Sequence, residues 1–322
     1  MKNMKIFALL TALIMLIACV PSLAEEAALV RVAALKGPTG MAFAHMMSQN
    51  DGSYEFTLAG APDELTAAVI SGSIDIAAVP TNLACVLHNK TEGNVQGMAV
   101  ITGGMLYVLE KGDSVQAVTD LEGKNVLSAG QGSTPEYIFN FILDAEGVSA
   151  NTEYMSEHSE VVSQAVAGNA DIVVLPEPHV TTLLTKDPSF RIALSVTDLY
   201  AHAAAEYGYA DAALHMSTII VNKAFAEKNP DAVAKFMADC EASILFAVEN
   251  VNEAAKEIVE NGIIASEAVA ASALPNCALT FITGDAMKTA LSPMLKVLFD
   301  ANPKSVGGKL PGADFFFGVT AE

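Results

Sequence analysis

The chain has 322 residues, of which 52% are hydrophobic and only 17% are charged. A composition this apolar supports folded domains with a sizeable core and excludes a disordered chain. Acidic residues outnumber basic ones by 37 to 17, which gives a formal charge of −20. This balance excludes nucleic acid as an expected partner, because phosphate binding needs a basic surface. The length is sufficient for two ordinary domains.

Residues 1–24 have the features of a secretory signal peptide. Lys2 and Lys5 precede an apolar run over residues 6–18, and small residues lead up to Ala24. This order of charge, apolar run and small residues is typical of a cleaved export signal. The run is shorter than the about 20 residues that a membrane-spanning helix needs. We therefore expect export to the periplasm or to the outer face of the cell membrane.

Two processing sites remain open at the end of this segment. Residues 16–19 fit the cleavage box of a bacterial lipoprotein, which would leave a lipid on Cys19. In the alternative, Cys19 is one apolar residue of the signal and cleavage follows Ala24. A lipid on Cys19 is the only membrane attachment that we expect. Cys240 lies on an apolar stripe with helical spacing, which predicts a buried free thiol.

Strands that alternate with helices predict an α/β fold with mainly parallel sheets. The expected elements are strands at residues 30–35, 74–79 and 95–102 and helices at residues 41–47 and 62–70. The final third differs, since Asn229, Pro230 and Asp231 form a helix start and further helix starts follow. We therefore expect a predominantly helical C-terminal third.

Five residues recur after a constant interval of 96 positions, which indicates an internal repeat. They are Glu64, Gly72, Asp75, Ile76 and Pro80, which recur as Glu160, Gly168, Asp171, Ile172 and Pro176. Two copies of one α/β unit predict two similar lobes, with strand ends directed at a shared crevice where ligands bind. Residues 30–34 should then superpose on residues 124–128. Asp75 and Asp171 should be equivalent and structural.

The chain resembles a known family over residues 29–318. The similar segments are residues 34–40, 72–80, 130–137, 175–178 and 306–311. They resemble the solute-binding proteins of ABC importers, in the nitrate, sulfonate and taurine branch that also contains thiamine-pyrimidine binders. The resemblance implies a two-lobe type II periplasmic binding protein fold, with mainly parallel sheets, two hinge strands and a helical C-terminal third.

The resemblance also implies how the chain is divided. Residues 28–104 would begin lobe I, residues 105–216 would form lobe II, and residues 217–322 would complete lobe I. The two crossings between lobes are expected at residues 105–109 and 217–221. Closure about such hinges is a standard way to trap a ligand.

The implied function is capture of a small, anionic organic solute by an exported monomer without a cofactor. Delivery would be to the permease and ATPase of an ABC importer. The sequence contains no Gly-x-Ser-x-Gly elbow and no histidine pair at zinc-binding spacing, so we do not expect an enzyme. Two alternatives stay open: an exported sensor or adaptor, and a small-acid lyase or dehydratase of the same fold, which the export signal disfavours.

Two turns that precede helices form the core of the candidate ligand site. Each ends in a threonine, Thr39 or Thr134, where free backbone N–H groups and the helix dipole favour an anion. Polar residues after the two Asp-Ile strands add hydrogen-bonding groups, and ordinary helix capping is the alternative role for both sets. The candidate ligand-binding residues are Lys36, Gly37, Pro38, Thr39, Gly40, Thr81, Asn82, Gly132, Ser133, Thr134 and Glu177.

Overall fold

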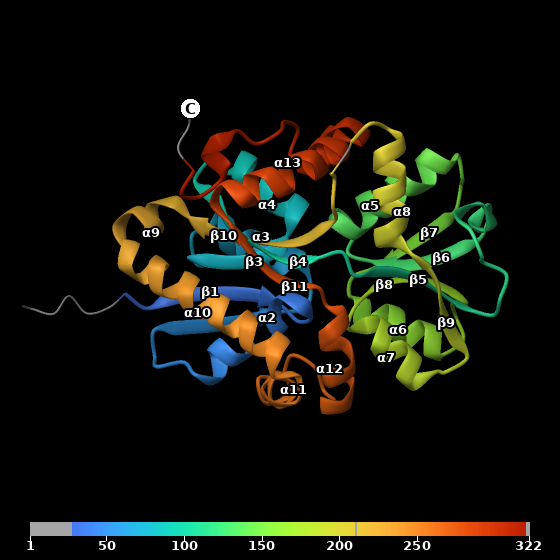
Figure 1. Ribbon diagram of the computed structural model, residues 1–322, viewed down its shortest axis with the longest axis horizontal. Coiled ribbons are helices and arrows are strands. Elements are labelled where there is room, and N and C mark those ends of the chain that lie inside the picture. Colours follow the sequence, from blue (N-terminus) through green and yellow to red (C-terminus); the bar gives the residue numbers. More distant parts are fainter. Residues whose placement is uncertain (1–27, 210, 320–322) are drawn as a thin grey trace, which may run out of the picture.

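The structure is a computed structural model that describes residues 28–209 and 211–319. Over these residues the strands form two separate sheets, which lie one after the other along the long axis of the molecule (Figure 1). We call each sheet, with the helices packed on it, a lobe. Residues 1–24 and Cys19 lie outside the described residues, so signal cleavage and lipidation stay predictions. No helix among the described residues is both long and apolar enough to span a membrane.

The first sheet contains six strands. In sheet order they are β11 (Leu279–Thr283), β4 (Val95–Gly103), β10 (His215–Asn222), β3 (Ile76–Pro80), β1 (Val30–Leu35) and β2 (Tyr54–Ala59). β1 pairs in parallel with β2 and β3, whereas β10 is antiparallel to both β3 and β4. β11 pairs antiparallel with β4 at the edge. Four of the six strands therefore run in one direction.

The second sheet contains five strands. In sheet order they are β7 (Asn151–Met155), β6 (Asn125–Ala129), β8 (Ile172–Pro176), β5 (Leu106–Lys111) and β9 (Phe190–Ser195). β6 is parallel to β7 and β8, and β5 is antiparallel to β8 and β9. The mainly parallel α/β fold is thus confirmed. Three strands are exceptions. β11 is an edge strand, and β5 and β10 each enter their sheet directly after the chain has crossed from the other lobe.

The internal repeat is confirmed by the order of the elements. In the first lobe each strand is followed by one helix: β1 by α2 (Pro38–Ser48), β2 by α3 (Pro62–Ile70) and β3 by α4 (Thr81–Lys90). The second lobe repeats this order: β6 is followed by α5 (Thr134–Glu146), β7 by α6 (His158–Val166) and β8 by α7 (His179–Lys186). Asp75 and Asp171 each directly precede the third strand of this unit, β3 or β8, so their positions are equivalent, as predicted. The strand β6 begins one residue after the predicted start.

The predicted crossings at residues 105–109 and 217–221 are wrong except at Met105, because the chain passes between the sheets before most of these residues. The first crossing, between β4 and β5, consists of Gly104 and Met105. The second lies between α8 (Val196–Glu206) and β10 and includes residues 207–209 and 211–214. Residues 106–109 and 217–221 therefore belong to the sheets themselves, because each crossing strand pairs along its full length after entering. The lobe boundaries proposed at residues 104/105 and 216/217 stay a prediction.

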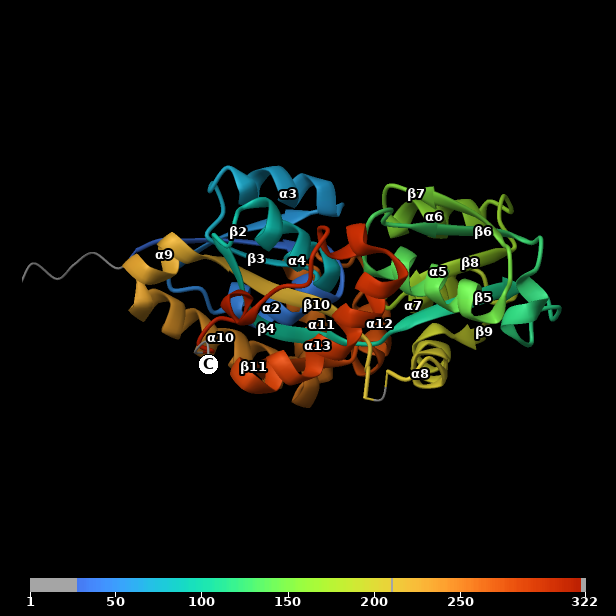
Figure 2. The same ribbon diagram turned by 90° about the horizontal axis from the view of Figure 1, so that it is seen from above.

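The C-terminal third is predominantly helical, as predicted. After β10 come α9 (Lys223–Lys228), α10 (Pro230–Glu249), α11 (Val251–Glu260), α12 (Glu267–Ala273) and α13 (Gly284–Ala301), with β11 between α12 and α13. Short 3₁₀ segments lie at Val118–Leu121, Leu274–Asn276, Pro303–Val306 and Ala313–Phe315. Figures 1 and 2 show that these helices pack on the first lobe and reach the second lobe where α12 and α13 end.

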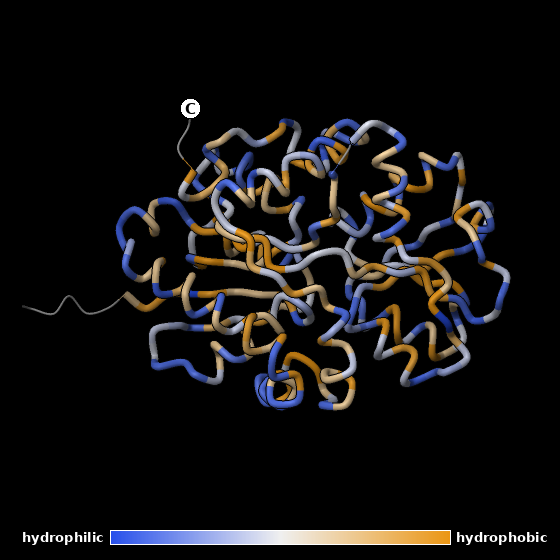
Figure 3. Tube along the Cα trace, in the orientation of Figure 1, coloured by the Kyte–Doolittle hydropathy of each residue, from blue (hydrophilic) through white to orange (hydrophobic). Residues whose placement is uncertain are grey.

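Buried apolar side chains form the core along the strands and the inner faces of the helices (Figure 3). The largest cluster contains residues of both lobes, such as Val79 in β3 and Val108 in β5. Cys240 lies on the buried face of α10, and the described cysteines Cys85, Cys240 and Cys277 are all buried free thiols. The prediction for Cys240 is therefore confirmed.

Replacing Asp75 with Asn should destabilise the protein, and the same change at Asp171 should not. The buried Asp75 carboxylate accepts hydrogen bonds from the backbone N–H of Arg31 and from its Nε, both at 2.9 Å. Asp171 is exposed, and its carboxylate bonds no other described residue. We expect Asp75→Asn to lower the free energy of unfolding by about 1.5–3 kcal/mol. Urea denaturation would contradict this if both variants lost the same amount.

Candidate functional site

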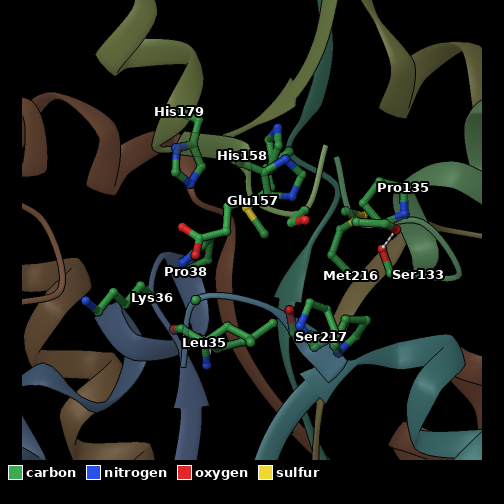
Figure 4. A pocket seen from close by; sticks show the side chains of 18 residues that line it. Leu35, Lys36, Pro38, Ser133, Pro135, Glu157, His158, His179, Met216 and Ser217 are labelled. Atoms are coloured by element: carbon green, nitrogen blue, oxygen red, sulfur yellow. Dashed lines mark hydrogen bonds between the residues drawn. The ribbon is translucent and has the colours of Figure 1, made fainter. Parts of the chain in front are cut away.

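A pocket lies between the two lobes at the carboxyl ends of six strands (Figure 4). It contains about 670 Å³ of empty space, counted together with the solvent at its mouth. Its lining includes a residue at or directly after the end of each of β1, β2, β3, β6, β7 and β8, namely Lys36, Gly60, Pro80, Gly130, Ser156 and Pro176. Ligands of open α/β sheets bind at this position.

Both copies of the repeat contribute equivalent positions to the pocket. Four pairs of lining residues are separated by 96 positions: Thr39 and Pro135, Gly60 and Ser156, Pro62 and His158, and Pro80 and Pro176. The two lobes thus present the same backbone elements to each other. Because the side chains differ within three of the four pairs, the two walls of the pocket have different chemistry.

A second pocket adjoins the first and makes the cleft continuous. The two pockets share Lys36, Gly60, Glu157, His158 and His179. The second extends along α6 and α7 towards residues 263–265, before α12. The first is largely apolar, with Leu35, Met105 and Met216 between the polar groups. A bound solute would therefore lie against side chains of both lobes.

The turn before α2 places most of its predicted residues at the cleft. Gly37 has a φ of 123°, a conformation that favours glycine. The Thr39 hydroxyl donates to the carbonyl of Leu35 at 2.8 Å and accepts from the Leu35 N–H at 3.1 Å, so it binds its own strand. Lys36, Gly37, Pro38 and Thr39 line the cleft. Gly40 does not line the cleft. It packs against the chain itself, because a Cβ there would lie 3.0 Å from the Leu35 carbonyl oxygen.

The equivalent turn before α5 is held by a contact between the lobes. The Thr134 hydroxyl donates to Oδ1 of Asn82 at 3.0 Å, and Nδ2 of Asn82 donates to the carbonyls of Gly132 and Ser305. Asn82 and Thr134 are completely buried. Ser133 lines the pocket, whereas Asn82, Gly132 and Thr134 do not. These residues join the start of α4 to the start of α5.

Two further predicted residues also make contacts within the protein. The Thr81 hydroxyl lies 3.1 Å from that of Thr218. The Glu177 carboxylate accepts hydrogen bonds from the Thr181 hydroxyl at 3.0 Å and from its backbone N–H at 3.1 Å. Burial raises the pKa of Glu177. Neither Thr81 nor Glu177 lines the two pockets, so capping describes the contacts of Glu177 in this structure.

Replacing Thr134 with Val should lower stability. The change leaves Oδ1 of the buried Asn82 without its donor, which costs about 1–3 kcal/mol in the free energy of unfolding. Thr185→Val is a matched control, because that hydroxyl makes an exposed bond to the Thr181 carbonyl. Chemical denaturation should show a change within about 0.5 kcal/mol for the control. Equal losses in both variants would show that the bond between lobes contributes nothing.

Among the residues that line the first pocket and were not predicted, three have titratable side chains: Glu157, His158 and His179. Figure 4 shows the Glu157 carboxylate and both imidazoles inside the pocket. The two imidazole rings lie with their centroids 5.3 Å apart and their planes tilted by 37°. The repeat contains a signal for two of them, because Glu157 and His158 follow Ala61 and Pro62 by 96 positions. Both pairs stand at a helix start.

The surroundings of both imidazoles favour the neutral form. Burial lowers the pKa of His158 to about 3, with the neighbouring His179 as a second cause. Burial also lowers the pKa of His179 to about 4. Nδ1 of His158 is buried without a hydrogen-bond partner among the described residues. The histidines therefore offer neutral donors and acceptors to the cleft, and no positive charge.

The histidine pair predicts a loss of stability in mild acid. The pKa of histidine in an unfolded chain is about 6.5, so between pH 6.5 and 4 the unfolded chain binds more protons than the folded one. Stability that depends on neutral His158 is therefore lost as the pH falls through this range. The free energy of unfolding of a His158→Gln variant should fall less over this range than that of wild type. For each unit by which the pH falls, the difference between the two losses should approach about 1.4 kcal/mol.

Urea denaturation at pH 7, 6, 5 and 4.5 measures this difference. The variant His202→Gln is the control, because His202 is exposed on α8. The control should follow the wild-type curve. Parallel curves for wild type and His158→Gln would contradict the buried neutral state of His158.

Comparison with known proteins defines the family to which this chain belongs. A sequence model of the family described as NMT1/THI5 like matches residues 55–254. The chain belongs to the NMT1/THI5-like family. A search of curated protein sequences found no match.

Solved structures of similar fold confirm the periplasmic binding protein architecture. A protein described as an ABC transporter from Parabacteroides distasonis is 24% identical with a TM-score of 0.73, covering 89% of this chain and 98% of its own. The periplasmic aliphatic sulphonate-binding protein SsuA of Escherichia coli is 16% identical with a TM-score of 0.71, and the match covers 90% of this chain and 92% of that protein. The alkanesulfonate-binding protein SsuA of Xanthomonas axonopodis pv. citri, bound to MOPS, is 17% identical with a TM-score of 0.67. The match covers 86% of this chain and 94% of that protein.

Proposed function

We propose that this protein captures a small solute in the cleft between its lobes and delivers it to the permease and ATPase of an ABC importer. The observation that carries the proposal is the pocket lined at equivalent positions by both copies of the repeat. A solute held there contacts both lobes, so binding favours their closed arrangement. Membership of the NMT1/THI5-like family and the printed names of the structural neighbours support this function.

The proposal includes export and capture without catalysis. Residues 1–24 have the pattern of an export signal, with either cleavage after Ala24 or a lipid on Cys19. The solute is released unchanged to the importer, and the protein acts as a monomer. Growth of a host that expresses the full chain, followed by cell fractionation, tests the location directly.

We infer that the solute carries an anionic group at the start of α2. The first turn of α2 contains no acidic residue and Gly37 provides no side-chain cap. The starts of α3, α5 and α6 differ, because each carries a glutamate, Glu64, Glu136 or Glu160, whose carboxylate accepts hydrogen bonds from backbone N–H groups that precede the helix. The positive dipole end of α2 therefore has no carboxylate of its own helix beside it, and Lys36 lies next to it.

A thermal-shift screen tests capture. The panel contains nitrate, sulfonates, aminopyrimidines, riboflavin-like compounds and aromatic acids. A solute at 100 times its dissociation constant should stabilise the protein by about 2.7 kcal/mol, which raises the melting temperature by several degrees. If no compound of these classes raises the melting temperature, the proposed function is wrong.

Replacing Lys36 with Met should weaken binding of any anionic solute found in the screen. The change removes the basic group next to the start of α2, and we expect about a tenfold loss of affinity, equal to about 1.4 kcal/mol. Lys304→Met is the control, because it removes the same charge from an exposed position outside the cleft. Isothermal titration calorimetry should show the loss in Lys36→Met alone. Equal affinities in both variants would place the anion elsewhere.

A further inference from the structure

The first crossing between the lobes is held to the first lobe at Gly103. The backbone N–H of Gly103 donates a hydrogen bond to the carbonyl of Ala278 at 2.8 Å. Ala278 directly precedes β11, the edge strand of the first sheet. A Cβ placed on Gly103 would lie 3.3 Å from the Cβ of Ala278. The chain is therefore fixed to the first lobe as far as the last residue of β4.

The same crossing is held to the second lobe at Met105. The carbonyl of Met105 accepts a hydrogen bond at 3.0 Å from the backbone N–H of Glu177, the residue that follows β8. The next residue, Leu106, already pairs with Pro176 at the end of that strand. Met105 also lines the first pocket. Gly104 is thus the one residue between the contacts to the first lobe and the contacts to the second.

The side chain of Thr197, from α8 of the second lobe, lies directly against Gly104. A Cβ placed on Gly104 would be 2.3 Å from Cγ2, 2.6 Å from Oγ1 and 3.0 Å from Cβ of Thr197. Carbon atoms in contact are normally about 3.5–4.0 Å apart, so position 104 has no room for a side chain. Gly104 is not among the glycines with a positive φ. The packing of Thr197, and not the backbone conformation, therefore requires glycine here.

Thr197 is held firmly in this position. It is the second residue of α8, whose start is capped by Ser195: the Ser195 hydroxyl accepts a hydrogen bond from the N–H of Asp198 at 3.2 Å. Ser195 also pairs with Tyr107 near the start of β5. A β-branched side chain is stiff about χ1, and rotation would leave its Cβ in place. Oγ1 of Thr197 is buried without a hydrogen-bond partner among the described residues, so its contact with Gly104 is one of shape.

We propose that Thr197 is a positioning residue that sets how the two lobes stand relative to each other. Its side chain seats Gly104, so the first crossing leaves the first lobe in one direction and Met105 reaches one place in the cleft. Neither Thr197 nor Gly104 lines the two pockets of the cleft, so both act through Met105 and the lobe that follows it. The consequence for solute capture rests on the proposed function, because a solute that contacts both walls needs them at one separation.

The distance between the lobes, measured without any solute, tests this inference. Ile70 at the end of α3 and Val166 at the end of α6 are equivalent in the repeat, lie in different lobes (Figure 2) and are 48% and 42% exposed. A protein with Ile70→Cys and Val166→Cys carries a nitroxide label at each position, and double electron–electron resonance gives the distance distribution. The buried native thiols should stay unlabelled in the folded protein. The protein without the two introduced cysteines is the labelling control.

Four variants of the labelled protein are compared. Gly104→Ala should shift the mean distance by at least about 2 Å, because the new Cβ overlaps Thr197. Adding Thr197→Ala to Gly104→Ala should reverse most of the shift, since the overlapping Cγ2 and Oγ1 are gone. Thr197→Ala alone should broaden the distribution, because Gly104 loses its seat. Thr197→Val has the same shape without the hydroxyl and should match wild type. Circular dichroism confirms that each variant is folded.

The outcomes separate this inference from the proposed function, because no solute is present. A shift in Gly104→Ala that the double variant reverses, with Thr197→Val like wild type, supports the inference. An unchanged distribution in Gly104→Ala, or a shift that the double variant keeps, overturns it. If Gly104→Ala does not fold, Thr197→Ala and Thr197→Val decide: equal distributions in these two variants overturn the inference. None of these results depends on whether a compound of the thermal-shift panel binds.

Discussion

Each sheet contains one strand that enters it from the other lobe and runs against the direction of its neighbours. β5 lies between β8 and β9, and β10 lies between β3 and β4, each with hydrogen bonds along both edges. This double exchange requires the two sheets to remain close, because neither is complete without a strand that has just crossed. It also brings the carboxyl ends of the parallel strands of both lobes to one cleft. The site depends on this arrangement more than on any single side chain.

The repeat produces two similar walls, and sequence differences between the copies give them different chemistry. Gly60 and Ser156 occupy equivalent positions, as do Ala61 and Glu157. The first lobe supplies a bare backbone where the second supplies polar groups. Asp75 and Asp171 differ in the same way, since Asp75 binds Arg31 and Asp171 faces solvent. Symmetric architecture with asymmetric side chains lets a small solute bind in one orientation.

Much of the fold was predictable from the sequence. The interval of 96 residues predicted two equivalent units, and Asn229 with Pro230 predicted the start of α10, because both signals are local or strictly periodic. The exact crossings were not predictable, since no turn or breaker pattern in the sequence shows at which strand end the chain passes into the other lobe. The antiparallel direction of β5 and β10 depends on pairing between distant segments, which no local pattern specifies.

The candidate site was predicted in position and only partly in detail. Residues 36–39 line the cleft because a strand end followed by a helix start has only one place in such a sheet. Asn82 and Thr134 looked equally suitable, yet their polar groups bond each other across 52 residues of sequence. Such pairings cannot be read from the chain. His158 and His179 were missed because histidines 21 residues apart show no spacing that marks a site.

The burial of the three described cysteines limits how readily oxidants react with the folded protein. Burial raises the pKa of the thiols of Cys85, Cys240 and Cys277 above the ordinary value. The thiolate is the form that attacks disulfides and reacts with peroxides, so these side chains are nearly inert while the chain is folded. Three thiols that cannot all pair are therefore harmless in the native state, whatever the redox potential of the surroundings. They become reactive during folding, when mispaired disulfides would compete with burial, so rapid burial of these residues protects the chain against misfolding.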